Sequence, residues 1–266
     1  QVTLKATVTN KGTVVAGQVR AITRSENPWL ADREFVFGKL NPGETRTWST
    51  SFKLEKGALS RLDPVKLEVS DEKGDKAEAA PIQVKMVGLP RPRFSYAYQI
   101  IDDLPGTQDN GDGVVQKGEE VRLHVVVKNV GDGPSFKTQA TLSNKSGDGI
   151  DVVKGRFDVD NIAPGASKTV DFTFVVQPDF AGDKFALQMD VYDQELREYV
   201  TDKLNFPIAN AVNVQPAAGV VKVHHDKAEV RAGALLDSPV IGTAKLNALL
   251  KVTGRTEQFW RVEVEP

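Results

Sequence analysis

The segment VRLHVVVKNVG, residues Val121–Gly131, decides the fold class of this chain. Apolar residues stand at every second position from Val121 to Val127, and this period of two is typical of a strand with one buried face. The Asn-Val-Gly that closes the segment is a turn signal, because Asn and Gly tolerate the backbone conformations that end a strand. The same alternation returns in VTLKATVTN (Val2–Asn10) and TVDFTFVV (Thr169–Val176). Helical periodicity over ten or more residues is hard to find, so the sequence predicts an all-β fold.

This segment has a counterpart earlier in the chain. LKATVTNKG (Leu4–Gly12) aligns with LHVVVKNVG (Leu123–Gly131), 119 positions later, and Phe35–Phe52 aligns with Phe157–Phe174, 122 positions later. In both copies a Pro-Gly turn separates two further strands, since Pro presets φ and Gly accepts the positive φ that follows. Two units of this length, with strands spaced by turns, predict tandem immunoglobulin-like β-sandwiches.

Two linkers divide the chain into predicted domains 1–88, 89–210 and 211–266. GLPRPR (Gly88–Arg93) holds two prolines and predicts a short, stiff connector, while ANAVNVQPAAGVV (Ala209–Val221) is a linker of small residues. The second unit carries RFSYAYQIIDD (Arg93–Asp103) ahead of its repeat, and the first unit shows no such strand. We therefore expect an open sheet edge beside Val2. Because the chain begins at Gln1 already in strand pattern, we also expect it to be processed or truncated.

Composition narrows the classes of partner. The chain has 266 residues, a formal net charge of −2 and no cysteine. Such a charge gives no general attraction to nucleic acid or to an anionic membrane, so we expect no nucleic-acid partner. No apolar run of about 18 residues predicts a membrane span. The lack of cysteine excludes disulfides and a cysteine nucleophile; it suits an oxidising periplasm but leaves the cytosol open.

The last fifty or so residues form a different module. Five short strands are expected there, at 221–223, 228–231, 240–244, 249–253 and 260–264, separated by polar turns. The order AEVRAGALLDSPVIGTAKLNALLKVTGRTEQFWRVEV resembles bacterial SH3-like domains, whose pattern is a VR strand, a variable loop, a VIG strand, and a late Trp before a final V-x-V. The resemblance implies a small SH3-like β-barrel. The sequence departs from the family at Asn247, where Gly is more usual.

Such modules commonly bind cell-wall peptides or pack on a neighbouring domain. Phe259 and Trp260 are the candidate ligand-binding residues of this one. The competing interpretation is that Trp260 belongs to the core, because a large aromatic residue in so small a barrel is usually buried.

The acidic loop QDNGDGVVQKGEE (Gln108–Glu120) is the candidate metal site. A calcium loop of the EF-hand kind takes oxygen ligands at positions 1, 3, 5, 7, 9 and 12, with Gly at position 6. The matching ligands are Asn110, Asp112, the carbonyl of Val114 and Glu119, while Gln stands at position 1 where Asp is expected. Asp102 and Asp103, just upstream, could supply the missing charge, and Asp103 is included among the candidate ligands. The sequence thus predicts either a weak structural Ca²⁺ site, with a Kd of about 10⁻⁴ to 10⁻³ M, or a turn with solvated carboxylates.

No catalytic residue is identified. The three histidines lack metal-binding spacing, and the chain contains no nucleophile elbow, phosphate-binding loop or dinucleotide fingerprint. A Ser/Lys dyad leaves little trace in a sequence, so whether the chain is itself an enzyme stays open.

Over nearly its whole length the chain resembles the C-terminal region of a tail-specific (C-terminal processing) serine peptidase of Gram-negative bacteria. The residues that carry the resemblance are FVFGKLNPGETRTW, RPRFSYAYQIIDD, NGDGVVQKGEEV, GRFDV and the SH3-like end. In that family a PDZ module and a Ser/Lys catalytic domain come first, and neither maps onto a residue here. The resemblance implies a non-catalytic scaffold of the periplasm or cell envelope that positions the protease or its substrate, with its own protease domain as one partner. The alternative is a cell-wall-binding or adhesion module, with peptidoglycan as partner and no link to a protease.

Overall fold

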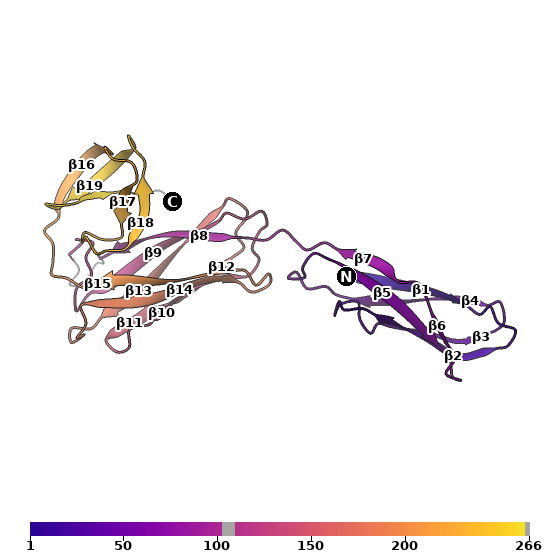
Figure 1. Ribbon diagram of the computed structural model, residues 1–266. Coiled ribbons are helices and arrows are strands. Elements are labelled where there is room, and N and C mark those ends of the chain that lie inside the picture. The colour runs from indigo at the N-terminus through magenta and orange to yellow at the C-terminus, as the bar shows by residue number, and fades with distance from the viewer. Residues whose placement is uncertain (103–109, 264–266) are drawn as a thin grey trace. The chain divides into compact units, whose positions relative to one another are not determined.

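The computed structural model describes residues 1–102 and 110–263 (Figure 1). All regular secondary structure in these residues is β-strand, which confirms the predicted all-β class. The chain forms two compact units, Gln1–Leu89 and Pro90–Pro266.

The first unit is a sandwich of two sheets. Strands β1 (Val2–Thr9) and β4 (Thr45–Phe52) form a two-stranded antiparallel sheet, from Val2 opposite Phe52 to Thr9 opposite Thr45. The second sheet has the order β3-β2-β5-β6, and β7 also pairs with β5. Its strands are β2 (Ala16–Arg24), β3 (Glu34–Leu40), β5 (Arg61–Ser70), β6 (Lys76–Glu78) and β7 (Ile82–Met86).

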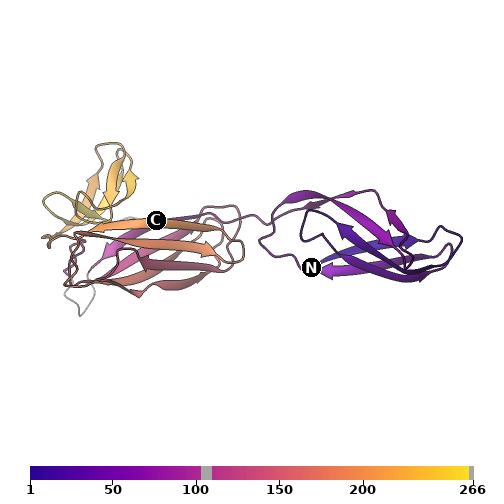
Figure 2. The same ribbon diagram turned by 60° about the horizontal axis from the view of Figure 1, so that its bottom comes forward.

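The second unit contains a larger immunoglobulin-like sandwich, whose strands lie in two layers (Figure 2). One sheet has the order β11-β13-β9-β8 and the other β12-β10-β14-β15. The strands are β8 (Phe94–Ile101), β9 (Glu120–Asn129), β10 (Thr138–Asn144), β11 (Ile150–Lys154), β12 (Arg156–Asp160), β13 (Ser167–Val176), β14 (Lys184–Asp193) and β15 (Tyr199–Pro207). Their inward side chains form one continuous core that includes the fully buried Leu123, Phe174 and Leu187.

The repeated Asn at the end of each first strand performs the same task in both units. Asn129 donates its backbone N–H to the carbonyl of Ala166 and accepts from the N–H of Gly165, at 3.0 and 2.8 Å. Asn10 makes the same two bonds with Glu44 and Gly43, at 2.9 and 2.7 Å. Both turn glycines have φ of 77°, as the Pro-Gly signal predicts. The repeat therefore marks structurally equivalent strand pairs, β1 with β4 and β9 with β13.

The C-terminal module has five short strands, the number expected, but the first begins at Gln215, inside the stretch that was predicted to be a linker, and not at Val221. They are β16 (Gln215–Lys222), β17 (Ala228–Arg231), β18 (Val240–Ala244), β19 (Leu249–Arg255) and β20 (Trp260–Val262). They pair as a sheet β16-β19-β20 and a separate sheet β17-β18. Within the described residues these ladders do not close into a ring, which corrects the expectation of a complete barrel; residues 264–266, where the last strand was expected to continue, lie outside them. Asn247 has φ of 65°, a conformation that Asn tolerates better than most residues.

Candidate functional site at the acidic loop and the C-terminal groove

The acidic loop joins β8 to β9, and its described part is organised by carboxylates that accept backbone N–H groups. Asp102 Oδ2 accepts from the N–H of Gly113 at 2.8 Å, and Asp112 Oδ1 accepts from that of Val114 at 2.8 Å. Glu119 Oε2 accepts from the N–H of Gln116 at 2.8 Å. These three hydrogen bonds stabilise the conformation of the loop, because each carboxylate accepts from a backbone N–H that has no partner in a strand.

All three carboxylate side chains are buried, which is unusual for acidic residues. Burial is the main reason that the pKa of Asp102 is raised to about 6; the hydrogen bond from Gly113 lowers this pKa, and the neighbouring charge of Asp112 adds to the rise. Asp112 Oδ2 also accepts from the N–H of Val212 at 2.6 Å and from the amide of Gln116 at 2.9 Å. Asp112 thus ties the loop to the linker that leads into the C-terminal module.

The structure places four of the five predicted metal ligands in this loop. Asn110 is exposed, and its Oδ1 accepts from the N–H of Asp112 at 2.9 Å. The carbonyl of Val114 accepts from Gln116 Nε2 at 3.4 Å, and Glu119 lies buried directly before β9. Asp103 falls outside the described residues. Among the residues that are described, no group of three or more acidic or histidine side chains forms a metal-binding cluster. The calcium site stays a prediction.

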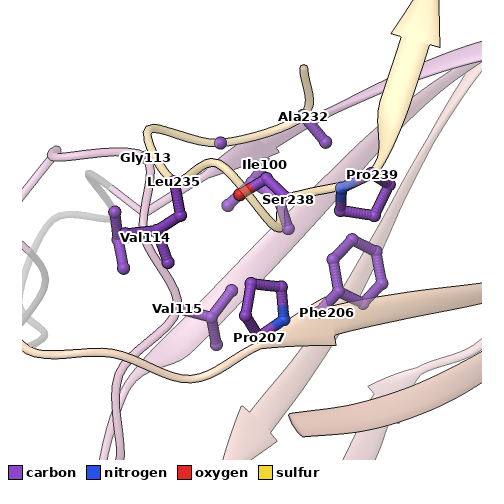
Figure 3. A pocket seen from close by; sticks show the side chains of 11 residues that line it. Ile100, Gly113, Val114, Val115, Phe206, Pro207, Ala232, Leu235, Ser238 and Pro239 are labelled. Atoms are coloured by element: carbon purple, nitrogen blue, oxygen red, sulfur yellow. The ribbon is translucent and has the colours of Figure 1, made fainter. Parts of the chain in front are cut away.

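The C-terminal module packs on the sandwich beside this loop. Figure 3 shows the seam, where Val114, Val115 and Phe206 of the sandwich meet the loop that runs from Ala232 to Pro239. The remaining cavity is about 10 Å³, too small to hold more than one water. Gly233 approaches so closely that a Cβ there would lie 2.5 Å from the carbonyl oxygen of Gly113. Arg261 closes the contact by donating to the carbonyl of Gly111 at 2.9 Å.

A larger groove lies within the module and at its junction with the sandwich. Its volume is about 420 Å³, within the usual range for small-molecule or peptide sites. Phe259 and Trp260, the predicted binding residues, both line it, together with His224, Arg231 and Ile241. The Trp260 side chain is 52% exposed. It is therefore not the core residue that the competing interpretation required.

Two hydrogen bonds between the sandwich and the C-terminal part were not predicted from the sequence. They join Arg261 to Gly111 and Val212 to Asp112, which are 150 and 100 positions apart, and no local sequence pattern indicates such distant contacts. His124 lies on β9, where its Nδ1 is 2.5 Å from Asp171 Oδ1 on the neighbouring strand β13. Both residues lie in the sheet β11-β13-β9-β8, and neither of them lines the C-terminal groove.

The described residues contain no helix that is long and apolar enough to cross a membrane. Comparison with known families gives one match within the second unit. Residues 102–210 match the CARDB family model. CARDB is an immunoglobulin-like β-sandwich domain of extracellular or cell-surface proteins, and the match begins at the acidic loop and ends at the linker before the C-terminal module.

A comparison with curated proteins gave no match. Among solved structures, one match comes from work on inhibition of the exo-beta-D-glucosaminidase CsxA by a glucosamine-configured castanospermine and an amino-australine analogue. Identity is 13%, the TM-score is 0.27, and the alignment covers 74% of this chain but 25% of that one. This chain thus spans about a quarter of the matched enzyme, and so weak a likeness bears on neither fold nor activity.

Proposed function

We propose that this chain is a non-catalytic interaction and spacing region of a cell-envelope protein. The observation that carries the proposal is the CARDB match over 102–210, in a sandwich whose end is fused by a tight seam to a second module. That seam fixes the position of a groove lined by Phe259 and Trp260. A rigid sandwich that presents an aromatic groove suits recognition of a partner.

The parent protein that we propose is a tail-specific serine peptidase of the periplasm, with this chain positioning the protease or its substrate. The support is the resemblance of NGDGVVQKGEEV, GRFDV and the SH3-like end to that family. The purified chain, incubated with an unfolded protein and an activity-based serine probe, should show neither turnover nor label. Labelling of one specific serine would replace the scaffold by an enzyme.

The second candidate is a cell-wall-binding or adhesion module, and the exposed aromatic side chain in the groove favours it. Exposed Trp and Tyr side chains are common anchors in binding sites because they supply a large contact area at little entropic cost. The ligand class is a short peptide, such as the stem peptide of peptidoglycan.

Binding to purified peptidoglycan fragments tests this candidate. Trp260→Ala should weaken binding by about tenfold or more, since aromatic anchors often contribute over 1 kcal/mol. Leu249→Ala is the matched control, because Leu249 is 70% exposed but does not line the groove. Equal binding by both variants would place the ligand elsewhere, and failure of the unmodified chain to co-sediment at low salt would count against a cell-wall role.

A further inference from the structure

The connector Gly88–Arg93 begins at a glycine that is packed tightly within the first unit. Gly88 donates its backbone N–H to Ser60 Oγ at 2.8 Å. A Cβ at Gly88 would lie 2.8 Å from the carbonyl oxygen of Ala58 and 2.9 Å from the backbone nitrogen of Ser60. The first residue of the connector is therefore held by the unit to which it belongs.

The other end of the connector is bonded to a turn of the second unit, Gly131–Gly133, whose sequence is Gly-Asp-Gly. Gly133 donates its N–H to the carbonyl of Arg91 at 3.1 Å, and Val130, directly before the turn, donates to the carbonyl of Arg93 at 2.7 Å. These two bonds fix the backbone of the connector at alternate residues.

The turn and the connector approach so closely that both flanking positions of the turn require glycine. A Cβ at Gly133 would lie 2.0 Å from the carbonyl oxygen of Pro90, and one at Gly131 would lie 2.4 Å from the backbone nitrogen of Arg93. Pro92, between these contacts, is buried. A side chain on either glycine would push the connector away from the turn.

Side chains complete this attachment. The completely buried Asn129 accepts from the N–H of Arg93 at 3.2 Å through its Oδ1. Arg91 donates to the carbonyl of Leu196 at 2.6 Å and to Glu198 Oε1 at 2.7 Å. Residues 90–93 thus belong to the second unit through contacts with three separate stretches of its chain.

Leu89 lies between the two anchored stretches. Across residues 1–102 and 110–263 its backbone has no hydrogen bond to another backbone group, and its side chain is 44% exposed. The following Pro90 has a fixed φ and disfavours a helical conformation at Leu89. The torsions that remain soft are therefore φ of Leu89 and ψ of Gly88.

We propose that Leu89 is a single-residue pivot between the two units, and that the turn 131–133 is a clamp that keeps residues 90–93 fixed on the second unit. A connector of six residues then acts as a joint of one, which lets the chain bend without the slack of a flexible linker. The pivot adds to the spacing role proposed above and does not depend on what the C-terminal groove binds.

Backbone ¹⁵N relaxation of the full chain tests the pivot without any variant. The amide order parameter should fall below about 0.6 at Leu89, the value of a flexible backbone, and stay near about 0.85 at Gly88, Arg91 and Arg93.

Gly133→Ala tests the clamp, because the added Cβ displaces Pro90. The order parameters at Arg91 and Arg93 should then fall to that of Leu89. Gly242→Ala is the matched control, since a Cβ there meets nothing within 4 Å, and it should change neither value. Arg91→Ala removes the bonds to Leu196 and Glu198 and should loosen Arg93 in the same direction, which keeps the test available if Gly133→Ala does not fold.

The chain contains no cysteine, so two introduced cysteines give unique labelling sites for a second readout. Lys73→Cys in the first unit and Lys184→Cys in the second are at exposed positions for a pair of dyes. Single-molecule energy transfer between them should show a distance distribution about twofold wider in Gly133→Ala, because five free residues replace one and the spread grows with the square root of their number.

Three results would overturn the proposal. They are low order parameters at Arg91 and Arg93 in the unmodified chain, an order parameter at Leu89 as high as at its neighbours, and a distance distribution that neither Gly133→Ala nor Arg91→Ala widens. Trp260→Ala should leave every one of these readouts unchanged, so failure of the pivot and failure of the C-terminal groove are distinguishable.

Discussion

Asp63 on β5 is the residue whose ionisation should govern the acid stability of the first unit. Its buried carboxylate accepts from Arg61 Nε and Nη2 at 2.7 and 2.5 Å, and from Asn27 Nδ2 at 2.8 Å. The hydrogen bonds from Arg61, and then that from Asn27, lower the pKa of Asp63 although burial acts in the opposite direction.

The sign of the pH effect follows from linkage. A carboxyl whose folded pKa is below its unfolded value of about 3.9 stabilises the fold above that pH, and the contribution disappears as the pH falls through the folded pKa. Asp63→Asn should therefore lower the melting temperature of the first unit at pH 7, and the difference from the unmodified protein should shrink as the pH falls below about 3.9. Calorimetry over a series of pH values from 7 downward measures this. A constant difference between the proteins would mean that the ionisation of Asp63 does not contribute.

The acidic loop gives a second prediction at this scale. If the oxygens of Asn110, Asp112, Val114 and Glu119 hold Ca²⁺ with the weak affinity expected, about 5 mM calcium should raise the melting temperature of the second unit and EDTA should reverse the rise. Glu119→Gln should abolish the calcium-dependent shift, whereas Glu120→Gln, one residue later, should not. A melting temperature that does not change with calcium would mean that the loop is a turn stabilised by its own carboxylates and not a calcium site.

At the scale of elements, the seam between the sandwich and the C-terminal module depends on Gly233. An added Cβ would lie 2.5 Å from the carbonyl oxygen of Gly113 and 3.0 Å from Ser238 Oγ, so the two backbones must separate. Gly233→Ala should lower the cooperativity of unfolding and detach the module, with a loss of about 1–3 kcal/mol.

Gly242 on β18 is the matched control in the same module, because a Cβ there meets nothing within 4 Å. Gly242→Ala should leave unfolding nearly unchanged. Trp29 and Trp48 lie in the first unit, so both variants are made with these two residues replaced by Phe. Urea denaturation followed by the fluorescence of the remaining Trp260 then distinguishes the two variants. Equal unfolding curves would mean that the added Cβ at Gly233 does not destabilise the seam.

Local pattern explains which of these elements were predictable. The alternation in Val121–Val127 and the Pro-Gly turns act over a few residues, so strands and hairpins could be expected, and 228–231 and 240–244 were placed with the bounds that β17 and β18 have. The repeat also predicted that β1 pairs on one side only among the residues that the structure describes. The exposure of Trp260 and the reach of Arg261 to Gly111 could not be predicted, because both depend on how the module packs against a sandwich encoded 100 or more residues earlier.

At the scale of the whole molecule, the two units should unfold separately. The buried apolar side chains of the first unit fall into two small clusters, one around Phe35 and Leu40 and the other around Leu30 and Val65. Most of those of the second unit form one continuous core that extends to Ala232 in the C-terminal module. Because a divided core buries less apolar surface, the first unit should have the lower transition in calorimetry.

The same substitution in each core assigns the two transitions. Leu40 in the first unit is 1% exposed and Leu187 in the second is completely buried, so truncation to Ala should cost about 2–5 kcal/mol at either site. Leu40→Ala should move only the lower transition and Leu187→Ala only the upper one. If both variants shifted a single transition, the units would be energetically coupled.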